Sequence, residues 1–568
     1  MKRRMKSNKS LIHTLIVLIG LIAVNFISSK AYSRFDLTED KRYTLSEASK
    51  SLIEDIDAPL IIDMFLEGDF PSEFRLLRNE TRQILEEFSI YTNNIKVNYI
   101  NPIEDEATRE RNIQELTRSG LTPFINTNST TGKVTQEIIF PWCFASYKGN
   151  TVKIPLLKRS ITEGLPEQIN NSVQGLEYGF ADGFSKLIKE KSKKIAILKG
   201  NGQLDDLDDK GRIKTKYLND FLKTLQSYYN IGFFTLDSVA TTPKKALDQI
   251  KQFDLIISAK PTEVFTEEEK LVLDQYTMNG GKSLWLTESV IMDKDSLYNN
   301  SGSAVPIARD LNLTNFFFKY GVRVNHTLVK DMYSAPIMLS IGEGNPAPLQ
   351  PVQWQYSPLA ASNPEHSITK NLNLVKFDFA SPMDTLKNSV KKTVLLQSSP
   401  KSKLSGSGTM ISLADVTKPL DEDTFNAGPQ NLAVLLEGEF TSVYDKAVLP
   451  FKLKAYKSKS KPTKMVVVSD GDVIKNKVIK NRPQELGFDQ VTGKSFGNKE
   501  FLMNTVNYLL DDTGLINIRS KEINIAYLDS DKITENKLQW QLINIALPLA
   551  LLGIFGLGFN YVRKKKYA

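Results

Sequence analysis

Two uncharged, apolar stretches lie near the two ends of a chain in which hydrophobic and polar positions otherwise alternate. The first, LIHTLIVLIGLIAVNFI, covers residues 11–27, and the second, LINIALPLALLGIFGLGFNYV, covers residues 542–562. As a helix the first would measure about 25 Å, which is short but adequate for a hydrocarbon core of about 30 Å when flanking residues anchor it. The pattern predicts two membrane-spanning helices that flank a large body. A cleaved signal peptide is the alternative for the first stretch, but Ser29-Lys30-Ala31 is a poor cleavage site.

The body between these stretches is too long for one hydrophobic core, since the chain has 568 residues. Its pattern of short apolar runs and amphipathic segments divides it into two α/β domains. The predicted organisation is a basic tail at 1–10, a span at 11–28, a juxtamembrane segment and helix at 29–58, a first domain at 59–190, a second domain at 191–530, a linker at 531–541, a span at 542–562 and a basic tail at 563–568.

The first domain has the order of a βαβ unit followed by a ββα unit, which is compatible with a thioredoxin-like fold. The predicted elements are strands at 60–66, 95–100, 137–147 and 151–157 and helices at 74–91, 108–119 and 167–189. After the first strand, where a redox protein carries a Cys-x-x-Cys motif, this chain has Asp69-Phe70-Pro71-Ser72. Dithiol chemistry is therefore excluded at that position, and Cys143 is the single cysteine.

The second domain begins with strands and helices in alternation, which predicts a doubly wound parallel sheet. The predicted elements are strands at 194–200, 231–237, 253–260 and 281–289, helices at 217–228 and 267–279, and added strands at 372–381, 392–399, 431–440 and 463–474. Two polar segments, 398–408 and 454–461, are predicted to be surface loops.

The positive charge of the chain is concentrated at its two ends. The formal net charge of +8 and the pI of about 9.0 would suggest a nucleic-acid partner if taken alone. Five Lys and Arg residues precede the first apolar stretch and four follow the second, and removing these nine charges from +8 leaves −1 for the body. We therefore expect no nucleic-acid partner. By the positive-inside rule, both termini should lie in the cytoplasm and the body in the periplasm, anchored by two spans in the cytoplasmic (inner) membrane.

Two sets of residues are candidates for contacts at the membrane. In the second span, Ala550, Gly553 and Gly556 would allow close approach of a helix from a membrane partner, although small residues are common in any span. In the juxtamembrane segment, Arg34, Lys41 and Arg42 could reach the phosphates of the lipid bilayer, the alternative being a solvated linker. Thr44 or Ser46 is then expected to cap the helix that follows.

Three long stretches carry a resemblance to a known family: RFDLTEDKRYTLSEASKSL at 34–52, FDLIISAKPTEVFTEEEKLVLDQYTMNGGKSLWLTES at 253–289, and the segment from VVVSDGDVI to INIRSKEI at 466–523. They resemble the auxiliary subunits, often labelled substrate-binding subunits, of the gliding-motility ABC transporters of Bacteroidota. The resemblance covers essentially the whole chain. It implies a membrane protein that works with a separate ABC permease and a separate ATPase.

The second domain is also similar, in fold only, to the glutamine-amidotransferase-like domain of intraflagellar-transport-type proteins. Relatives often carry Gly-His-Gly-Glu after the first strand of this domain, whereas this chain has Gly200-Asn201-Gly202-Gln203. A role for that His-Glu pair is not expected here.

The motifs for nucleotide binding are incomplete. A phosphate-binding loop needs GxxxxGK[ST], but the GKS at 281–283 has Tyr276 in place of the first glycine, and the GKS at 493–495 has Phe488 there. The sequence LSGSG at 404–408 resembles the signature of transporter ATPases but lies in a polar segment without a nucleotide-binding fold. The ATPase must therefore be another chain.

Metal and catalytic motifs are equally weak. The acidic segment around Asp206 and Asp208 has a lysine, Lys210, among the ligand positions of a calcium loop, so a solvated turn is favoured. His326 and His366 are the histidines of the body, too few to indicate a metal centre or a Ser-His-Asp site.

The sequence predicts a non-catalytic auxiliary subunit of an ABC transporter, with no catalytic residue, no cofactor and no metal. The alternative is a subunit that captures a solute in a cleft between the two domains, and a hydrolase acting on cell-envelope polymers is a more distant one. The solute, the direction of transport and the oligomeric state do not follow from the sequence.

Overall fold

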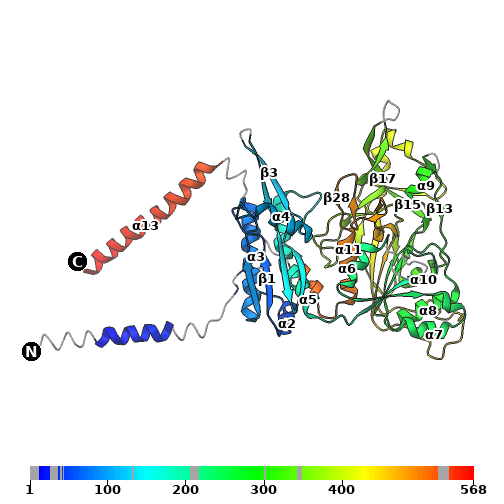
Figure 1. Cartoon of the computed structure of the whole chain (residues 1–568), viewed down its shortest axis with the longest axis horizontal. Coiled ribbons are helices and arrows are strands. Elements are labelled where there is room, and N and C mark those ends of the chain that lie inside the picture. Colours follow the sequence, from blue (N-terminus) through cyan, green and yellow to red (C-terminus); the bar gives the residue numbers. More distant parts are fainter. Residues whose placement is uncertain are drawn as a thin grey trace, which may run out of the picture. The chain divides into compact units, whose positions relative to one another are not determined.

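The structure, a computed structural model, describes residues 12–25, 36, 38, 41, 44–130, 133–204, 216–299, 302–341, 348–521 and 536–567. The chain divides into two compact units, Met1–Lys521 and Glu522–Ala568. The second unit contains one long helix, α13 (Lys537–Tyr567), drawn in red in Figure 1.

Among the described residues, α13 is the one helix that is long and apolar enough to cross a membrane, and the candidate span within it is Lys537–Lys566. Pro548 lies inside this helix. The amino-terminal apolar helix, Ile12–Asn25, is shorter, and at 1.5 Å per residue it covers about 21 Å. The first of the two predicted spans therefore stays a prediction, and residues 1–11 and 26–35 lie outside the described part of the chain.

The first domain is built around a four-stranded sheet with strand order β2-β1-β5-β6. Strands β1 and β2 are parallel, and β5 is antiparallel to both of its neighbours. Helix α5 contacts α3 and the sheet. The elements of this domain are α2 (Glu47–Glu54), β1 (Leu60–Met64), α3 (Ser72–Tyr91), β2 (Ile95–Tyr99), α4 (Arg109–Arg118), β3 (Phe124–Thr130), β4 (Lys133–Ile139), β5 (Trp142–Tyr147), β6 (Asn150–Pro155) and α5 (Leu165–Ile188).

The order of these elements agrees with the predicted βαβ and ββα units, but one predicted strand is wrong. The segment Glu137–Tyr147 is two strands, because Pro141 has no N–H to continue a ladder and separates β4 from β5. Strand β4 pairs with β3, a strand that the sequence analysis missed. The assignment of the domain to the thioredoxin-like class stays a prediction.

The second domain contains a large mixed sheet whose main path runs β16-β17-β20-β23-β24-β10-β9-β7-β8. The strands from β24 to β8 are parallel to one another, as predicted. The strands from β16 to β23 are antiparallel, and β23 is antiparallel to β24; they include strands that the sequence pattern predicts as additions to the parallel sheet without fixing their direction. The strands of this path are β7 (Lys194–Lys199), β8 (Asn230–Thr235), β9 (Leu255–Ala259), β10 (Lys282–Leu286), β16 (Ser334–Ser340), β17 (Leu349–Ser362), β20 (Lys391–Gln397), β23 (Asn431–Gly438) and β24 (Thr463–Val468).

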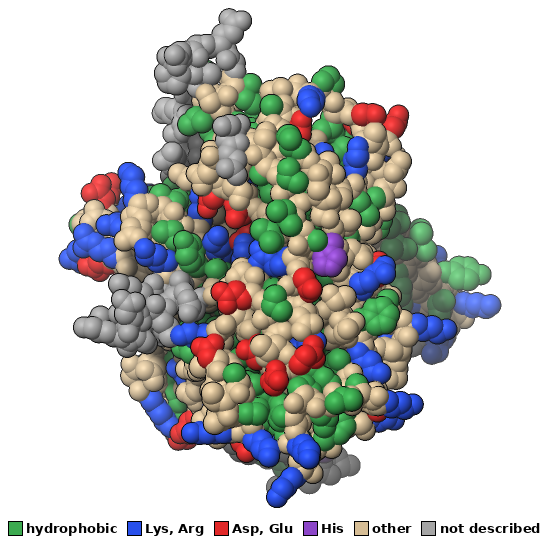
Figure 2. All heavy atoms as spheres, turned by 90° about the vertical axis from the view of Figure 1, so that its right-hand side faces the viewer, with side chains coloured by type: hydrophobic (Ala, Val, Ile, Leu, Met, Phe, Trp, Pro, Cys, Tyr) green, Lys and Arg blue, Asp and Glu red, His purple; other side chains and the backbone are tan. Residues whose placement is uncertain are grey.

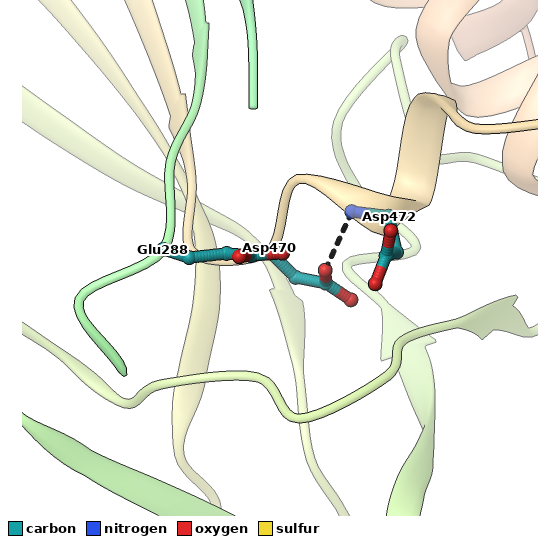
Figure 3. A group of neighbouring side chains, drawn as sticks. All are labelled: Glu288, Asp470 and Asp472. Carbon is teal, nitrogen blue, oxygen red and sulfur yellow. Dashed lines mark hydrogen bonds between the residues drawn. The ribbon is translucent and has the colours of Figure 1, made fainter. Parts of the chain in front are cut away.

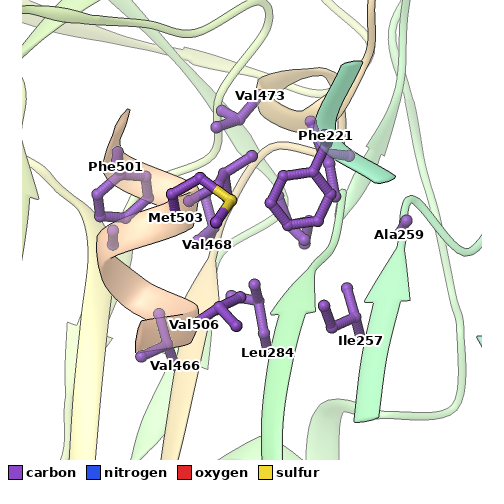
Figure 4. Packing of buried hydrophobic residues seen from close by; sticks show 14 of the residues in the cluster. Phe221, Ile257, Ala259, Leu284, Val466, Val468, Val473, Phe501, Met503 and Val506 are labelled. Atoms are coloured by element: carbon purple, nitrogen blue, oxygen red, sulfur yellow. The ribbon is translucent and has the colours of Figure 1, made fainter. Parts of the chain in front are cut away.

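Helices cover both faces of the parallel part of this sheet. Successive residues of a strand point to opposite faces of the sheet. Leu284 of β10 therefore packs in the buried cluster on one face, and its neighbour Trp285 packs in the cluster on the other face. The first cluster includes α6 and α11, and the second includes α7, α8 and α10. Figure 4 shows Phe501, Met503 and Val506 of α11 on the same side of the sheet as Val466 and Val468 of β24, within the first cluster. The helices are α6 (Asn219–Gln226), α7 (Pro243–Ile250), α8 (Glu267–Met278), α9 (Lys294–Asn299), α10 (Thr314–Tyr320) and α11 (Asn498–Leu510).

Short strands and 3-10 turns complete the domain. The predicted loop at 398–408 is wrong in part, because β21 (Ser402–Gly406) pairs with β15 (Thr327–Asp331). The sequence of β21 is mainly polar, so it gives no hydrophobic signal for a strand. The pairing with β15 is made by hydrogen bonds between backbone groups, which any sequence carries. The other short elements are η1 (Asp237–Ala240), β11 (Val290–Ile291), β12 (Ser303–Ala304), β13 (Ile307–Ala308), β14 (Val322–Val324), β18 (Val375–Lys376), β19 (Met383–Thr385), β22 (Ile411–Ser412), η2 (Leu413–Thr417), η3 (Glu422–Thr424), η4 (Asp472–Ile474), β25 (Val478–Ile479), β26 (Arg482–Pro483), β27 (Phe488–Asp489), β28 (Lys494–Ser495) and η5 (Leu515–Ser520).

The face of the second domain shown in Figure 2 carries acidic and basic side chains side by side, with hydrophobic side chains between them. A surface that binds the phosphate backbone of a nucleic acid usually gathers Lys and Arg on one side. Among the described residues of this face, Lys and Arg side chains do not gather into a separate basic patch.

Candidate functional site

Charged side chains meet at the carboxyl edge of the parallel strands in the second domain. Lys260 directly follows β9, Glu288 follows β10 by two residues, and Asp470 and Asp472 follow β24. The carboxyl ends of parallel strands are where open α/β sheets commonly bind ligands. Figure 3 shows the three acidic residues together, and their carboxylate oxygens lie within 4.8 Å of one another.

The charged groups of this cluster form an ion network. The Lys260 Nζ lies 2.6 Å from Asp472 Oδ1 and 2.9 Å from Glu288 Oε1. The backbone N–H of Asp472 donates to Asp470 Oδ1 over 2.7 Å, the contact drawn in Figure 3. The backbone N–H of Asp378 donates to the other oxygen of Asp470 over 2.6 Å. Asp378 is in turn paired with Lys294 at 2.6 Å.

The pKa shifts in the cluster follow from burial and from these pairs. Burial lowers the pKa of Lys260, but the nearby Asp472 and Glu288 raise it more, so the net shift is upward. Burial, together with the negative charges of Asp472 and Glu288, raises the pKa of Asp470 well above its usual range. Burial would raise the pKa of Asp378 as well, but Lys294 and Lys376 lower it to about 2.

Lys260 therefore stays protonated and serves as counter-ion to two of the three carboxylates. An ammonium in this place satisfies the charge that a metal ion would otherwise neutralise, and a protonated lysine is neither a base nor a nucleophile. Backbone packing is also tight, because a Cβ on Gly471 would lie 2.9 Å from Lys260 Cα. The arrangement indicates a structural ion network at the sheet edge.

The turn Gly200-Asn201-Gly202-Gln203 closes the carboxyl end of β7 with buried amide groups. The Asn201 side chain donates to Glu269 Oε2 over 3.0 Å, and its backbone N–H donates to Gln203 Oε1 over 2.7 Å. Glu269 also completes the capping box of α8 with Thr266. The amides therefore hold a turn against a helix start, which is a structural role.

A second group of polar side chains joins the two ends of the body at one buried carboxylate. Glu177 lies in α5 and is 3% exposed. Its Oε1 accepts from the Ser46 backbone N–H over 2.7 Å and from the Ser49 hydroxyl over 2.9 Å. Its Oε2 lies 2.9 Å from the Lys521 Nζ, which also donates to the Thr44 carbonyl over 2.8 Å. We call these residues, Thr44, Ser46, Ser49, Glu177 and Lys521, the Glu177 clamp.

The clamp draws together positions far apart in the sequence. Ser46 also caps α2, since its hydroxyl accepts from the Ser49 backbone N–H, which confirms one of the two predicted caps. Burial raises the pKa of Glu177, but the charge of Lys521 and the hydrogen bonds from Ser46 lower it more, so Glu177 stays ionised. The clamp holds the start of the body and its last described residue, Lys521, against the middle of α5.

A groove lies between the first domain and the second, with α5 along one wall. Its volume is about 1080 Å³. Contacts at its walls join the domains: Lys158 Nζ lies 2.6 Å from Glu500 Oε1, and the Asn373 side chain donates to the Arg159 carbonyl over 2.7 Å. The groove lies where the solute-binding alternative places its cleft.

The residues predicted to contact the membrane lie only partly within the described chain. Arg34 and Arg42 lie outside the described residues. Lys41 is exposed, and its carbonyl accepts from the Thr44 N–H over 3.1 Å. In α13, a Cβ placed on Gly553 or Gly556 would point into open space beyond the backbone of the helix itself, and Ala550 of the same helix is exposed.

The incomplete motifs of the sequence have structural roles where they are described. Lys282 and Ser283 begin β10, and the Tyr276 hydroxyl donates to the Lys282 carbonyl. The GKS at 493–495 ends in β28, which pairs with β27. His326 Nδ1 lies 2.9 Å from the Ser289 carbonyl, and the His366 ring lies edge-on to Tyr508. The acidic segment around Asp206 lies outside the described residues.

Neither the sheet-edge cluster nor the Glu177 clamp was found from the sequence. The cluster had a usable signal, because Lys260 and the sequence Ser469-Asp470-Gly471-Asp472 directly follow buried strands. The Glu177 clamp had no such signal, since no sequence pattern near Glu177 or Lys521 identifies either residue as a partner of Ser46.

Residues 192–505 of the chain match the model of the family described as "ABC-type uncharacterized transport system". Residues 39–146 match a domain of unknown function, DUF7088. No curated protein matches the chain. Among solved structures, the chain is similar to the "mmIFT52 N-terminal domain", with 13% identity, coverage of 56% of this chain and 99% of that chain, and a TM-score of 0.29. A TM-score this low carries no argument about the fold.

Proposed function

Because the chain belongs to the ABC-type uncharacterized transport system family, we propose that it is a membrane-anchored, non-catalytic auxiliary subunit of an ABC transporter. The apolar helix α13 supports an anchor in the membrane. The ion network at the sheet edge supports a role without catalysis, since its lysine is held protonated between carboxylates.

The Glu177 clamp is the observation that carries this proposal. Chain segments lead from Thr44 toward the amino-terminal apolar stretch and from Lys521 toward α13. Both segments leave the body beside one buried carboxylate, Glu177. A body held at one place by two tethers is more restricted in its rotation than a body on a single tether. This arrangement suits a subunit that presents a folded domain to membrane partners in a defined orientation.

The finer parts of the proposal follow from the resemblance and from the charge pattern. The partners are an ABC permease and an ATPase on separate chains, and the process is gliding motility. The body lies in the periplasm, both termini lie in the cytoplasm, and the second span contacts the permease through Ala550, Gly553 and Gly556. The lipid bilayer is contacted by Arg34, Lys41 and Arg42.

Two measurements test this proposal. Protease added to intact spheroplasts should degrade the segment 28–541 and spare the two basic tails, whereas protection of residues 205–209 would contradict a periplasmic body. Deletion of the gene should abolish gliding while the permease remains at its normal abundance. If cells without the gene still glide, the proposed role in gliding motility is contradicted.

Solute capture is the second candidate, and the groove between the domains favours it. A solute that binds only the native protein, at a hundred times its dissociation constant, adds about 2.7 kcal/mol to the free energy of unfolding. A purely structural auxiliary subunit would show no such stabilisation with any solute.

A further inference from the structure

The groove between the two domains is lined by an excess of basic side chains. Its lining contains eight Lys and Arg residues and three Asp and Glu residues, an excess of five positive charges. The body as a whole carries a net charge of −1 between its basic tails, so this excess is local to the groove. The charged residues of the lining are Lys153, Lys158, Arg159, Asp182, Lys186, Lys370, Glu485, Lys494, Lys499, Glu500 and Arg519.

Two cations of the groove share a single carboxylate. Glu500 is shared by two cations, with Lys158 Nζ at 2.6 Å and Arg519 Nη2 at 3.1 Å from the same oxygen. Burial lowers the pKa of Lys158, Glu500 raises it and the neighbouring Arg519 lowers it, so the net shift is downward. Lys158 is partly buried, with 24% of its side chain exposed, and an anion bound beside it would stabilise its positive charge.

Two further cations at the groove bind backbone carbonyls. The Arg159 guanidinium donates to the Pro123 carbonyl over 2.7 Å, and Lys494 Nζ lies 3.4 Å from the Ile161 carbonyl. A carbonyl accepts a hydrogen bond but does not neutralise the charge of its donor. Both side chains therefore keep their positive charge available to a ligand.

Two glycines on the α5 wall of the groove leave space that larger side chains could occupy. Gly175 and Gly179 both line the groove, four residues apart on one face of the helix. Apart from the backbone of the helix itself, no atom lies within 4 Å of a Cβ placed on Gly175, and the nearest one to Gly179 is Ile154 Cγ2 at 4.0 Å. Gly183 differs, since a Cβ there would lie 2.6 Å from Ile154. Glycine is a poor helix former, and packing within the chain does not require it at 175 or 179.

We propose that this groove binds an organic anion: a carboxylate, sulfonate or phosphate ester attached to an apolar body. The anionic group lies toward Lys158, Arg159 and Lys494. The apolar body lies along Gly175 and Gly179, in a lining that also holds aromatic and aliphatic side chains. The volume of about 1080 Å³ is slightly above the usual range of ligand pockets, about 300–1,000 Å³. This inference rests on the solute-capture form of the proposed function.

The test uses the purified full chain in lipid nanodiscs and isothermal titration with three probes. These are 1-naphthyl phosphate, the neutral 1-naphthalenemethanol, and inorganic phosphate. We expect saturable binding of 1-naphthyl phosphate that weakens with added salt, and binding at least about tenfold weaker (about 1.4 kcal/mol) for the two other probes. Absence of saturable binding of 1-naphthyl phosphate, or equal binding of the neutral probe, would overturn the proposal.

Variants locate the site. The double variant Arg159→Ala/Lys494→Ala should weaken binding at least about tenfold (about 1.4 kcal/mol), whereas Lys387→Ala, an exposed lysine outside the groove lining, should leave it unchanged. Gly179→Leu should abolish binding by filling the groove, and its matched control Gly179→Ala should retain it. Unchanged binding in both groove variants would place the anion elsewhere and overturn the proposal.

The source of the anion is settled by a parallel titration with dihexanoyl phosphatidic acid. Tighter binding of this short-chain lipid assigns the groove to a lipid, and tighter binding of 1-naphthyl phosphate assigns it to a soluble solute. Failure of the auxiliary role has a different readout, the absence of transporter subunits on copurification, so the two failures are distinguishable.

Discussion

Replacing Glu177 by glutamine should loosen the start of the body from α5. The amide oxygen can still accept from the Ser46 N–H and the Ser49 hydroxyl, but the charge opposite Lys521 is lost, as is the acceptor now 2.9 Å from its Nζ. Removing one partner of a buried ion pair costs about 3–5 kcal/mol. The Lys521 side chain is 19% exposed and keeps its bond to the Thr44 carbonyl, so we expect a smaller loss, about 2 kcal/mol.

The assay is hydrogen exchange of the backbone amides in α2, measured by mass spectrometry on the full chain. The amides of α2 exchange when this helix opens locally, and this opening breaks the clamp. If the free energy of local opening falls by about 2 kcal/mol, exchange should be about 30-fold faster. Glu47→Gln is the matched control, because Glu47 lies in the same helix, is 91% exposed and pairs with Lys50. An exposed pair of this kind contributes about 0–1 kcal/mol, so the control should exchange almost like the parent.

The pH dependence adds an independent check with a defined sign. The pKa of Glu177 is lower in the folded protein than its usual value, about 4.3 in an unfolded chain. Its contribution is therefore fully present above that value and is lost as the pH falls through the folded pKa. Protection of α2 in the parent should decrease on acidification below about pH 4.3, and Glu177→Gln should lack this component. Equal exchange in Glu177→Gln and the parent at pH 7 would refute the clamp.

Two further predictions concern the membrane helix and the nucleotide motifs. The double variant Gly553→Leu/Gly556→Leu should insert normally, but the amount of permease that copurifies with it should be several-fold lower than with Ala550→Leu. The reason is that bulky side chains keep a neighbouring helix at a distance. If the double variant retains as much permease as Ala550→Leu, α13 is a passive anchor. The purified chain should bind no ATP at millimolar concentration in a filter-binding assay, because Lys282 and Lys494 lack the first glycine of a phosphate-binding loop; saturable binding lost on changing either lysine would contradict this.

The parallel strands β7, β9, β10 and β24 were predictable because they are buried on both faces. Strand β9 is fully buried over its five residues, and such strands appear in the sequence as uninterrupted apolar runs. Strand β21 was not predictable, since its residues are mainly polar and its pairing with β15 is set by a segment about 75 positions earlier. The long strand β17 was likewise missed, because it combines three glutamines and two serines with two prolines and pairs with different neighbours along its length.

The candidate sites divide in the same way. The sheet-edge cluster could have been found, since a charged residue directly after a buried strand must lie at the carboxyl edge of the sheet. The Glu177 clamp could not, because it depends on the packing of α2 and α5 and on the return of the chain at Lys521. The groove depends on how the two domains pack together, which no local pattern in either domain contains.

Copurification after gentle detergent extraction tests the auxiliary role most directly. The full chain is tagged at its carboxyl terminus, solubilised from its own membranes, purified, and its partners are identified and quantified by mass spectrometry. We predict an ABC permease and an ATPase as separate chains, recovered in constant proportion to the tagged protein across independent preparations. Recovery of the tagged chain without either transporter subunit, under conditions that keep other membrane complexes intact, would contradict the account.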